Sequence, residues 1–121
     1  FPELSWGDAY FYYAPDGVVP ERTQPYGTIV TKDYPDDHAS ALGEPGRFRV
    51  NIHVGRERAA ELTATPADPA AADVFFRHPL YGDAGWVCVV NPGERTGARV
   101  LALLRTAHDA ARARARRRGA R

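Results

Sequence analysis

Polar and apolar side chains alternate without a break in RFRVNIHV, residues 47–54, the most informative segment of the chain. Successive side chains of a β-strand point to opposite faces of the sheet, so this period of two predicts a strand. One face carries the apolar set Phe48, Val50, Ile52 and Val54, and the other carries the polar set Arg47, Arg49, Asn51 and His53. We expect the apolar face to be buried and the polar face to be either wet or used by a ligand.

Each of three other stretches also predicts a strand. DAYFYY at 8–13 is rich in aromatic residues, TIVTK at 28–32 is β-branched, and GWVCVVN at 85–91 is an apolar run of strand length. The first two are expected to pair, because a Pro-Asp-Gly turn signal and a short loop separate them. The acidic loop that follows contains Asp36 and Asp37, which we interpret as turn and solubility residues.

Two short helices are predicted between the strands. RERAAELTA at 56–64 has apolar residues at helical spacing and no helix breaker. DPAAADVFF at 68–76 is the second candidate, with Asp68 as its N-cap and Pro69 at its first helical position. Helices in this part of the chain would cover one face of the sheet.

The longest helix is predicted at residues 97–117. Its apolar stripe consists of Val100, Leu103, Leu104, Ala107 and Ala111. The basic tail at 112–121 keeps a helical composition but loses this stripe, so we expect it to fray into solvent. The order of elements predicts a single α+β domain over residues 1–121, a twisted and mainly antiparallel sheet backed by the long C-terminal helix and by short helices.

Composition argues against a membrane-spanning protein and against a disulfide-linked or multi-cysteine metal protein. No apolar run approaches the ~20 residues that span a bilayer, and a single cysteine excludes an internal disulfide or a multi-cysteine metal site. Residues 105–121 carry seven arginines against Asp109, which leaves the first 104 residues with a formal charge of −5. We expect a reducing, cytoplasmic setting. The chain has no methionine and no signal peptide, so we expect a natural N-terminal segment to precede Phe1.

The outer face of residues 47–54 is the candidate ligand-binding surface. The predicted ligand-binding residues are Arg49, Asn51, His53, His78, Trp86 and Tyr12, with Tyr10 as the alternative to Tyr12 and Thr31 as a further neighbour. Aromatic walls with a few polar anchors are typical of small-molecule sites, and Arg49 would suit an anionic ligand such as a carboxylate. The alternative is a solvated face with ordinary cross-strand pairs.

The segment RHPLYGDAGWVCVVNPG at 77–93 holds the remaining candidates for chemistry. His78 either contacts the ligand or holds its loop by bonding a backbone carbonyl. Trp86 either fills the core or lines a pocket. Cys88 lies in an apolar run, where burial raises the pKa of a thiol and makes it a poor nucleophile. The four histidines form no pair at metal-ligand spacing, so neither a metal nor a cofactor is predicted.

Several blocks of the chain resemble known families. The series WGDAYFYYAPDG, IVTKDYP, FRVNIHVGRE and HPLYGDAGWVCVVNPG, with the closing helix, is similar to a domain-of-unknown-function family found mainly in actinobacteria. That resemblance implies a helical segment ahead of the PELSWGD block. More remotely, the order of elements resembles that of the MmcQ/YjbR proteins, which implies their CyaY-like sandwich. Neither resemblance implies a catalytic residue.

The sequence therefore predicts a small-molecule-binding protein with an accessory or self-protection role in bacterial metabolism, and leaves open whether it catalyses a reaction. The alternative is a nucleic-acid or protein interaction module that acts through the arginine-rich tail. The acidic body argues against nucleic acid, and no membrane partner is expected. An exposed sheet face can also pair two subunits, so a homodimer stays open.

Overall fold

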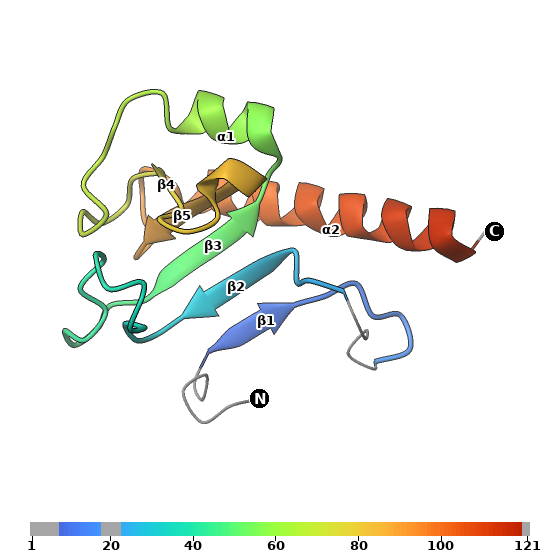
Figure 1. Cartoon of the computed structure of the whole chain (residues 1–121), viewed down its shortest axis with the longest axis horizontal. Helices are drawn as coiled ribbons and strands as arrows, with labels where there is room; N and C mark the ends of the chain where they lie inside the picture. The colour runs from blue at the N-terminus through green and yellow to red at the C-terminus, as the bar shows by residue number, and fades with distance from the viewer. Residues whose placement is uncertain (1–7, 18–22, 120–121) are drawn as a thin grey trace.

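A five-stranded sheet forms the centre of the fold (Figure 1). The structure, a computed structural model, describes residues 8–17 and 23–119. Its strands are β1 (Ala9–Phe11), β2 (Gly27–Val30), β3 (Arg49–His53), β4 (Phe76–Arg77) and β5 (Trp86–Val90). Its helices are α1 (Arg56–Leu62), the 3₁₀ turn η2 (Gly82–Ala84) and α2 (Gly97–Gly119).

The strands lie in the order β1-β2-β3-β5-β4, and every neighbouring pair is antiparallel. The alternating strand β3 therefore occupies the middle of the sheet, between β2 and β5. Val50 pairs with Ile29 on β2 and with Val89 on β5, so apolar side chains from three strands share one face. Every residue of β5 is buried, which explains why its sequence is apolar throughout.

Helix α2 lies along one face of the sheet (Figure 1), and its apolar stripe packs against the apolar side chains of that face. The buried core on this side consists of Val50, Ile52, Ala59, Val87, Val89, Val100, Leu103 and Ala107. Helix α1 contributes Ala59, and Leu62 packs against the same cluster. A mainly antiparallel sheet with helices on one face confirms the predicted α+β class.

The prediction of a short helix at 68–76 is wrong. Asp68 does accept a hydrogen bond from the backbone N–H of Ala70 at 2.9 Å, but only a turn follows. Asp73 then takes the left-handed conformation, with φ at 59°, which an α-helix does not accommodate. Its N–H donates to the carbonyl of Val90 at 2.7 Å, so the segment runs beside β5 and leads into β4. An Asp-Pro pair occurs in turns as well as at helix starts. Here the hydrogen bond to Val90 on β5 favours the turn and the extended path that follows it.

The same Asp73 organises the start of α2. Its carboxylate accepts hydrogen bonds from the backbone N–H groups of Gly93, Arg95 and Thr96 at 2.8–2.9 Å and from the Thr96 hydroxyl. The Thr96 hydroxyl and these backbone donors hold the pKa of Asp73 at about 2. A carboxylate twenty to twenty-three residues earlier in the chain thus satisfies the backbone N–H groups of the turn that leads into the helix.

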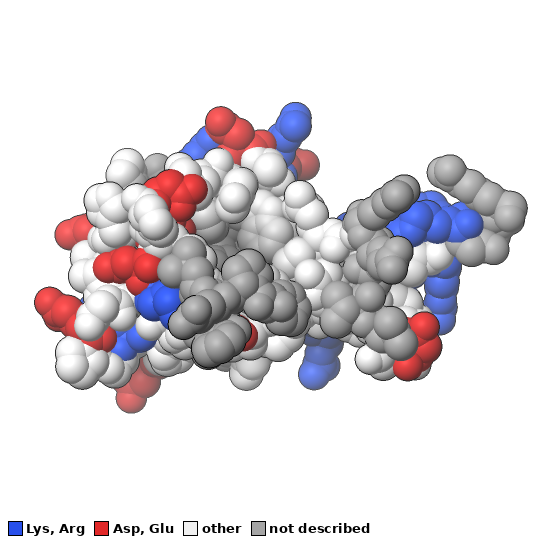
Figure 2. Space-filling view, turned by 60° about the horizontal axis from the view of Figure 1, so that its bottom comes forward, with Lys and Arg blue, Asp and Glu red and all other residues white. Residues whose placement is uncertain are grey.

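Residues 112–119, which the sequence predicted to fray, continue helix α2 as far as Gly119. Residues 120 and 121 of that predicted tail lie outside the described part of the chain. Alanine and arginine are strong helix formers, and arginine near a helix C-terminus interacts favourably with the helix dipole. The basic end of α2 therefore projects beyond the strands as a helix (Figure 1). Figure 2 shows basic side chains gathered at this end.

Candidate functional site

The face of the sheet opposite α2 carries a row of polar side chains that is buried rather than solvated. Asn51 on β3 lies between Thr28 on β2 and Cys88 on β5. The Asn51 Nδ2 donates to the Thr28 hydroxyl at 2.8 Å. Arg49, two residues before Asn51 and on the same face, is only 1% exposed. Something besides water must therefore satisfy the charge of its guanidinium.

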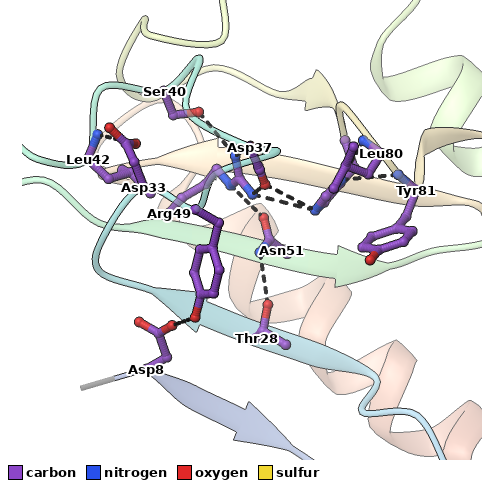
Figure 3. A network of polar contacts seen from close by, with 12 residues as sticks. Asp8, Thr28, Asp33, Asp37, Ser40, Leu42, Arg49, Asn51, Leu80 and Tyr81 are labelled. Atoms are coloured by element: carbon purple, nitrogen blue, oxygen red, sulfur yellow. Dashed lines mark hydrogen bonds and ion pairs between the residues drawn. The ribbon is translucent and has the colours of Figure 1, made fainter. Parts of the chain in front are cut away.

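Arg49 is satisfied by four hydrogen bonds to three residues (Figure 3). Its Nε donates to Asn51 Oδ1 at 2.8 Å. Its Nη1 donates to Asp37 Oδ1 at 2.9 Å and to the Ser40 hydroxyl at 3.3 Å, and its Nη2 donates to Asp37 Oδ2. The two parallel bonds to Asp37 form the bidentate pair that the planar guanidinium favours.

Asp37 reaches Arg49 because of a tight turn in the acidic loop. The backbone N–H and carbonyl groups of Tyr34 and Asp37 bond each other at 3.1 and 3.0 Å, and Pro35 presets the first turn position. The interpretation of Asp37 as a solubility residue is therefore wrong, because its side chain is 9% exposed and is paired. Its neighbour Asp36 is exposed, as that interpretation expects.

The pairing fixes both ionisation states. Burial by itself raises the pKa of the Asp37 carboxyl, but the hydrogen bonds and charge of Arg49 outweigh burial and hold that pKa below its usual value. Burial likewise lowers the pKa of Arg49, and Asp37 more than reverses this effect. Arg49, Asn51 and Asp37 thus form a polar floor on this face of the sheet. This floor contains a carboxylate and a guanidinium whose charges cancel locally.

His78 lies beside this pair and is held by its own loop. Its Nδ1 accepts hydrogen bonds from the backbone N–H groups of Leu80 and Tyr81, at 3.1 and 3.2 Å. Holding the loop was one of the two roles predicted for His78, although the bonded groups are N–H donors and not the expected carbonyl. Burial, followed by the charge of Arg49, lowers the pKa of His78 to about 4, so the imidazole is neutral at pH 7.

A cavity of about 530 Å³ lies over this floor. Polar lining residues come from the strands and the acidic loop, and the walls are largely aromatic. The lining consists of Tyr10, Gln24, Pro25, Thr28, Val30, Tyr34, Asp36, Asp37, Arg49, Asn51, His78, Leu80, Tyr81, Ala84 and Trp86. Segments from four separate parts of the chain therefore enclose one space.

The structure brings four of the six predicted ligand-binding residues together and leaves two outside. Those that line the cavity are Arg49, Asn51, His78 and Trp86. His53 faces the same side, but its Nε2 bonds the carbonyl of Ala84 at 3.0 Å and its ring packs on Trp86. Tyr12 follows the end of β1 and is not among the lining residues.

Some cavity residues differ from the predicted set for identifiable reasons. Tyr10, the alternative to Tyr12, lies in β1 directly opposite Thr28 on β2, and both residues line the cavity. Thr28 takes the place expected for Thr31, which instead bonds Asp8. The strand pattern could have identified Thr28, since it alternates with the apolar Ile29.

Burial makes Cys88, the candidate thiol nucleophile, a poor one. Cys88 is fully buried, and burial raises the pKa of its thiol to about 12. In residues 8–17 and 23–119, no group of three or more His, Cys, Asp or Glu side chains is placed to hold a metal ion. Over the same residues, no helix is long and apolar enough to cross a membrane.

Fold and site together define an α+β protein that carries a cavity of ligand size on the polar face of its sheet. The chain belongs to DUF6194, a family of unknown function whose profile matches residues 2–120. This match confirms the expected membership in a domain-of-unknown-function family. No curated protein and no solved structure matches the chain. The likeness to the MmcQ/YjbR sandwich and the actinobacterial distribution therefore stay predictions.

Proposed function

We propose that this chain binds a small molecule in the cavity above Arg49 and Asn51. The observation that carries the proposal is a cavity of about 530 Å³ whose polar floor is held in place by its own hydrogen bonds. Small-molecule sites commonly measure roughly 300–1,000 Å³ and combine apolar walls with a few fixed polar groups. Because the floor is already ordered, a ligand does not have to immobilise it.

The charges around the cavity favour an uncharged ligand over the anion expected from the sequence. Arg49 is the cationic lining residue, and Asp37 already occupies two of its donors. Asp36 adds a second carboxylate to the lining, so these three groups carry a net formal charge of −1. The proposed ligand is therefore a neutral molecule with a flat or apolar body that packs on Trp86 and Tyr81.

A fragment screen with one cavity variant and one control variant tests the proposal. Uncharged aromatic fragments would be screened by ligand-observed NMR and by thermal shift. We expect hits that Tyr81→Ala weakens, because Tyr81 lines the cavity and is 55% exposed, so its truncation leaves the fold intact. Leu101→Ala is the control, because Leu101 is 70% exposed on α2 and is not a lining residue. Hits that respond equally to both variants, or no hits at all, would refute cavity binding.

The second candidate function is an interaction with nucleic acid through the basic end of α2. The observation that favours it is that this segment is helical and projects from the sheet, which exposes a row of arginines (Figure 2). Arginines that contact phosphates release counterions, so binding would weaken steeply with salt. Replacing the four arginines at 114–118 by glutamine should then abolish binding to a short DNA duplex and leave fragment binding in the cavity unchanged.

The accessory or self-protection role in bacterial metabolism, the cytoplasmic setting and the homodimer remain predictions from the sequence. The identity of a ligand would test the first of these. Light scattering on the purified chain would test the last.

A further inference from the structure

The hydrogen bonds of His78 fix which of its ring nitrogens carries the proton. Nδ1 accepts two backbone N–H bonds, from Leu80 and Tyr81, so it must present a lone pair. A neutral imidazole with a lone pair on Nδ1 carries its hydrogen on Nε2. The His78 side chain lines the cavity and is only 5% exposed, so this N–H is shielded from bulk water.

The Nε2–H of His78 faces a second donor. Nη2 of Arg49 lies 3.5 Å from Nε2, and a guanidinium nitrogen can only donate. One hydrogen of Nη2 is bonded to Asp37 Oδ2, and the other is on the side toward His78. Asp37 Oδ2 lies 3.9 Å from Nε2, which is beyond hydrogen-bond distance. Among the described residues, the contact with Arg49 Nη2 is therefore the one hydrogen-bond contact of Nε2, and with this tautomer it joins two donors with no acceptor between them.

We propose that His78 Nε2–H and Arg49 Nη2–H form a subsite that binds one oxygen atom of the ligand, the carbonyl oxygen of an uncharged amide. This inference rests on the proposed function, because both side chains line the same cavity. Two buried donors without an acceptor are stabilised by any oxygen that accepts from both, as in sites that bind developing oxyanions.

The neighbouring charges select a carbonyl over a carboxylate. Asp37 lies against both donors and keeps its negative charge, because its pairing with Arg49 favours the ionised form. A ligand carboxylate at the subsite would face this carboxylate at close range, whereas a carbonyl oxygen brings no net charge. Asp36 on the cavity lining acts in the same direction. The aromatic walls at Trp86 and Tyr81 favour an aryl group next to the carbonyl, so the ligand class is an aromatic carboxamide.

The first measurement reads the tautomer of His78 without any ligand. Long-range ¹H–¹⁵N spectra of the protein labelled with ¹⁵N-histidine distinguish a protonated ring nitrogen from one that carries a lone pair. The His78 signals are assigned by their loss in His78→Asn. We expect a protonated Nε2 and an unprotonated Nδ1 at pH 7. A protonated Nδ1, or a doubly protonated ring, would overturn the subsite.

The second measurement compares benzamide with benzoate, which share a ring and differ in charge. We expect benzamide to bind at least about tenfold more tightly, with chemical-shift changes at cavity residues. His78→Asn should weaken benzamide about tenfold and leave benzoate unchanged, because the asparagine oxygen can still accept from the loop while the Nε2 donor is lost. His53→Asn is the matched control, because His53 lies on the same face outside the cavity lining, and it should change neither affinity.

The outcomes separate the subsite from the proposed function. Equal affinity for the two probes, or benzamide binding that His78→Asn does not weaken, would overturn the subsite while cavity binding stands. Fragments without a carbonyl that occupy the cavity while benzamide does not would have the same meaning. If neither these probes nor any screened fragment shifts a cavity residue, both proposals fail.

Discussion

Replacing Asp37 by asparagine tests the physical basis of the site more directly than any other single substitution. The change removes the carboxylate that accepts hydrogen bonds from both terminal nitrogens of Arg49. The guanidinium that remains belongs to a residue that is only 1% exposed. A water shell cannot take over, because the side chains of Arg49 and Asp37 are only 2% and 9% exposed. The variant therefore keeps a buried charge without its counter-charge.

The size of the effect follows from the class of interaction. Breaking a buried ion pair by removing one partner lowers the free energy of unfolding by about 3–5 kcal/mol, whereas an exposed pair contributes about 1 kcal/mol or less. For a domain of this length, each kcal/mol moves the midpoint of thermal unfolding by roughly 4 °C. We therefore expect Asp37→Asn to lower Tm by about 12–20 °C, measured by calorimetry or by circular dichroism at pH 7.

The adjacent residue supplies the control for this experiment. Asp36→Asn removes the same charge from the same loop, but Asp36 is exposed, so we expect a change within about 0.5 kcal/mol. In a second arm, Asp37→Leu combined with Arg49→Met should recover much of the loss, because no unpaired charge then remains. If Asp37→Asn and Asp36→Asn lower Tm equally, the Arg49 network is solvated and the description of the floor is wrong.

Three further predictions follow from other parts of the structure. Between pH 6.5 and about 4 the unfolded chain binds the His78 proton and the folded chain does not, so stability should fall by about 3 kcal/mol as the pH is lowered through this window. Denaturant titrations should show a flatter profile for His78→Asn. Cys88, buried and with its pKa raised to about 12, should react with iodoacetamide at pH 7.5 far more slowly in the native protein than in urea, and equal rates would contradict its burial. Gly85→Ala should lower the free energy of unfolding by about 2–5 kcal/mol, because its Cβ would meet the backbone of Gly55 at 2.6 Å and its φ is 92°. Gly17→Ala, with a φ of 74° but open space, should cost only about 1–2 kcal/mol, and an equal loss in both variants would contradict the close backbone approach.

Local patterns accounted for most of the fold. The period of two in residues 47–54 and the stripe of α2 encode which side of each element meets the core, and the apolar run of β5 encodes burial on both faces. The structure confirms the stripe of α2, the run of β5 and the burial of Val50 and Ile52, whereas Phe48, ahead of β3, is 37% exposed. The exception at 68–76 depended on a contact with Val90, which lies in a strand that comes later in the chain. An edge of the sheet that accepts hydrogen bonds can override a local helix signal, and no local pattern contains that edge.

The candidate site, like the fold, was predictable only in part from local patterns. Alternation alone placed Arg49 and Asn51 on the outer face, and they line the cavity. The alternation could not show that Arg49 is already paired, because its partner Asp37 comes from a loop twelve residues away that reads as solvated. Nor could it show which nitrogen of His78 holds the proton, because that depends on how the chain turns after Pro79.

Local sequence patterns were thus enough to predict the class of fold, the side of the sheet that is apolar and the strand face on which the polar groups lie. These properties depend on the periodicity of side chains along one element, which is written in consecutive residues. The burial of the polar face, the cancellation of its charges and the cavity above it could not be predicted in this way. Those properties depend on which distant segments come together, because burial and the electrostatic environment of a group belong to all of its neighbours in space.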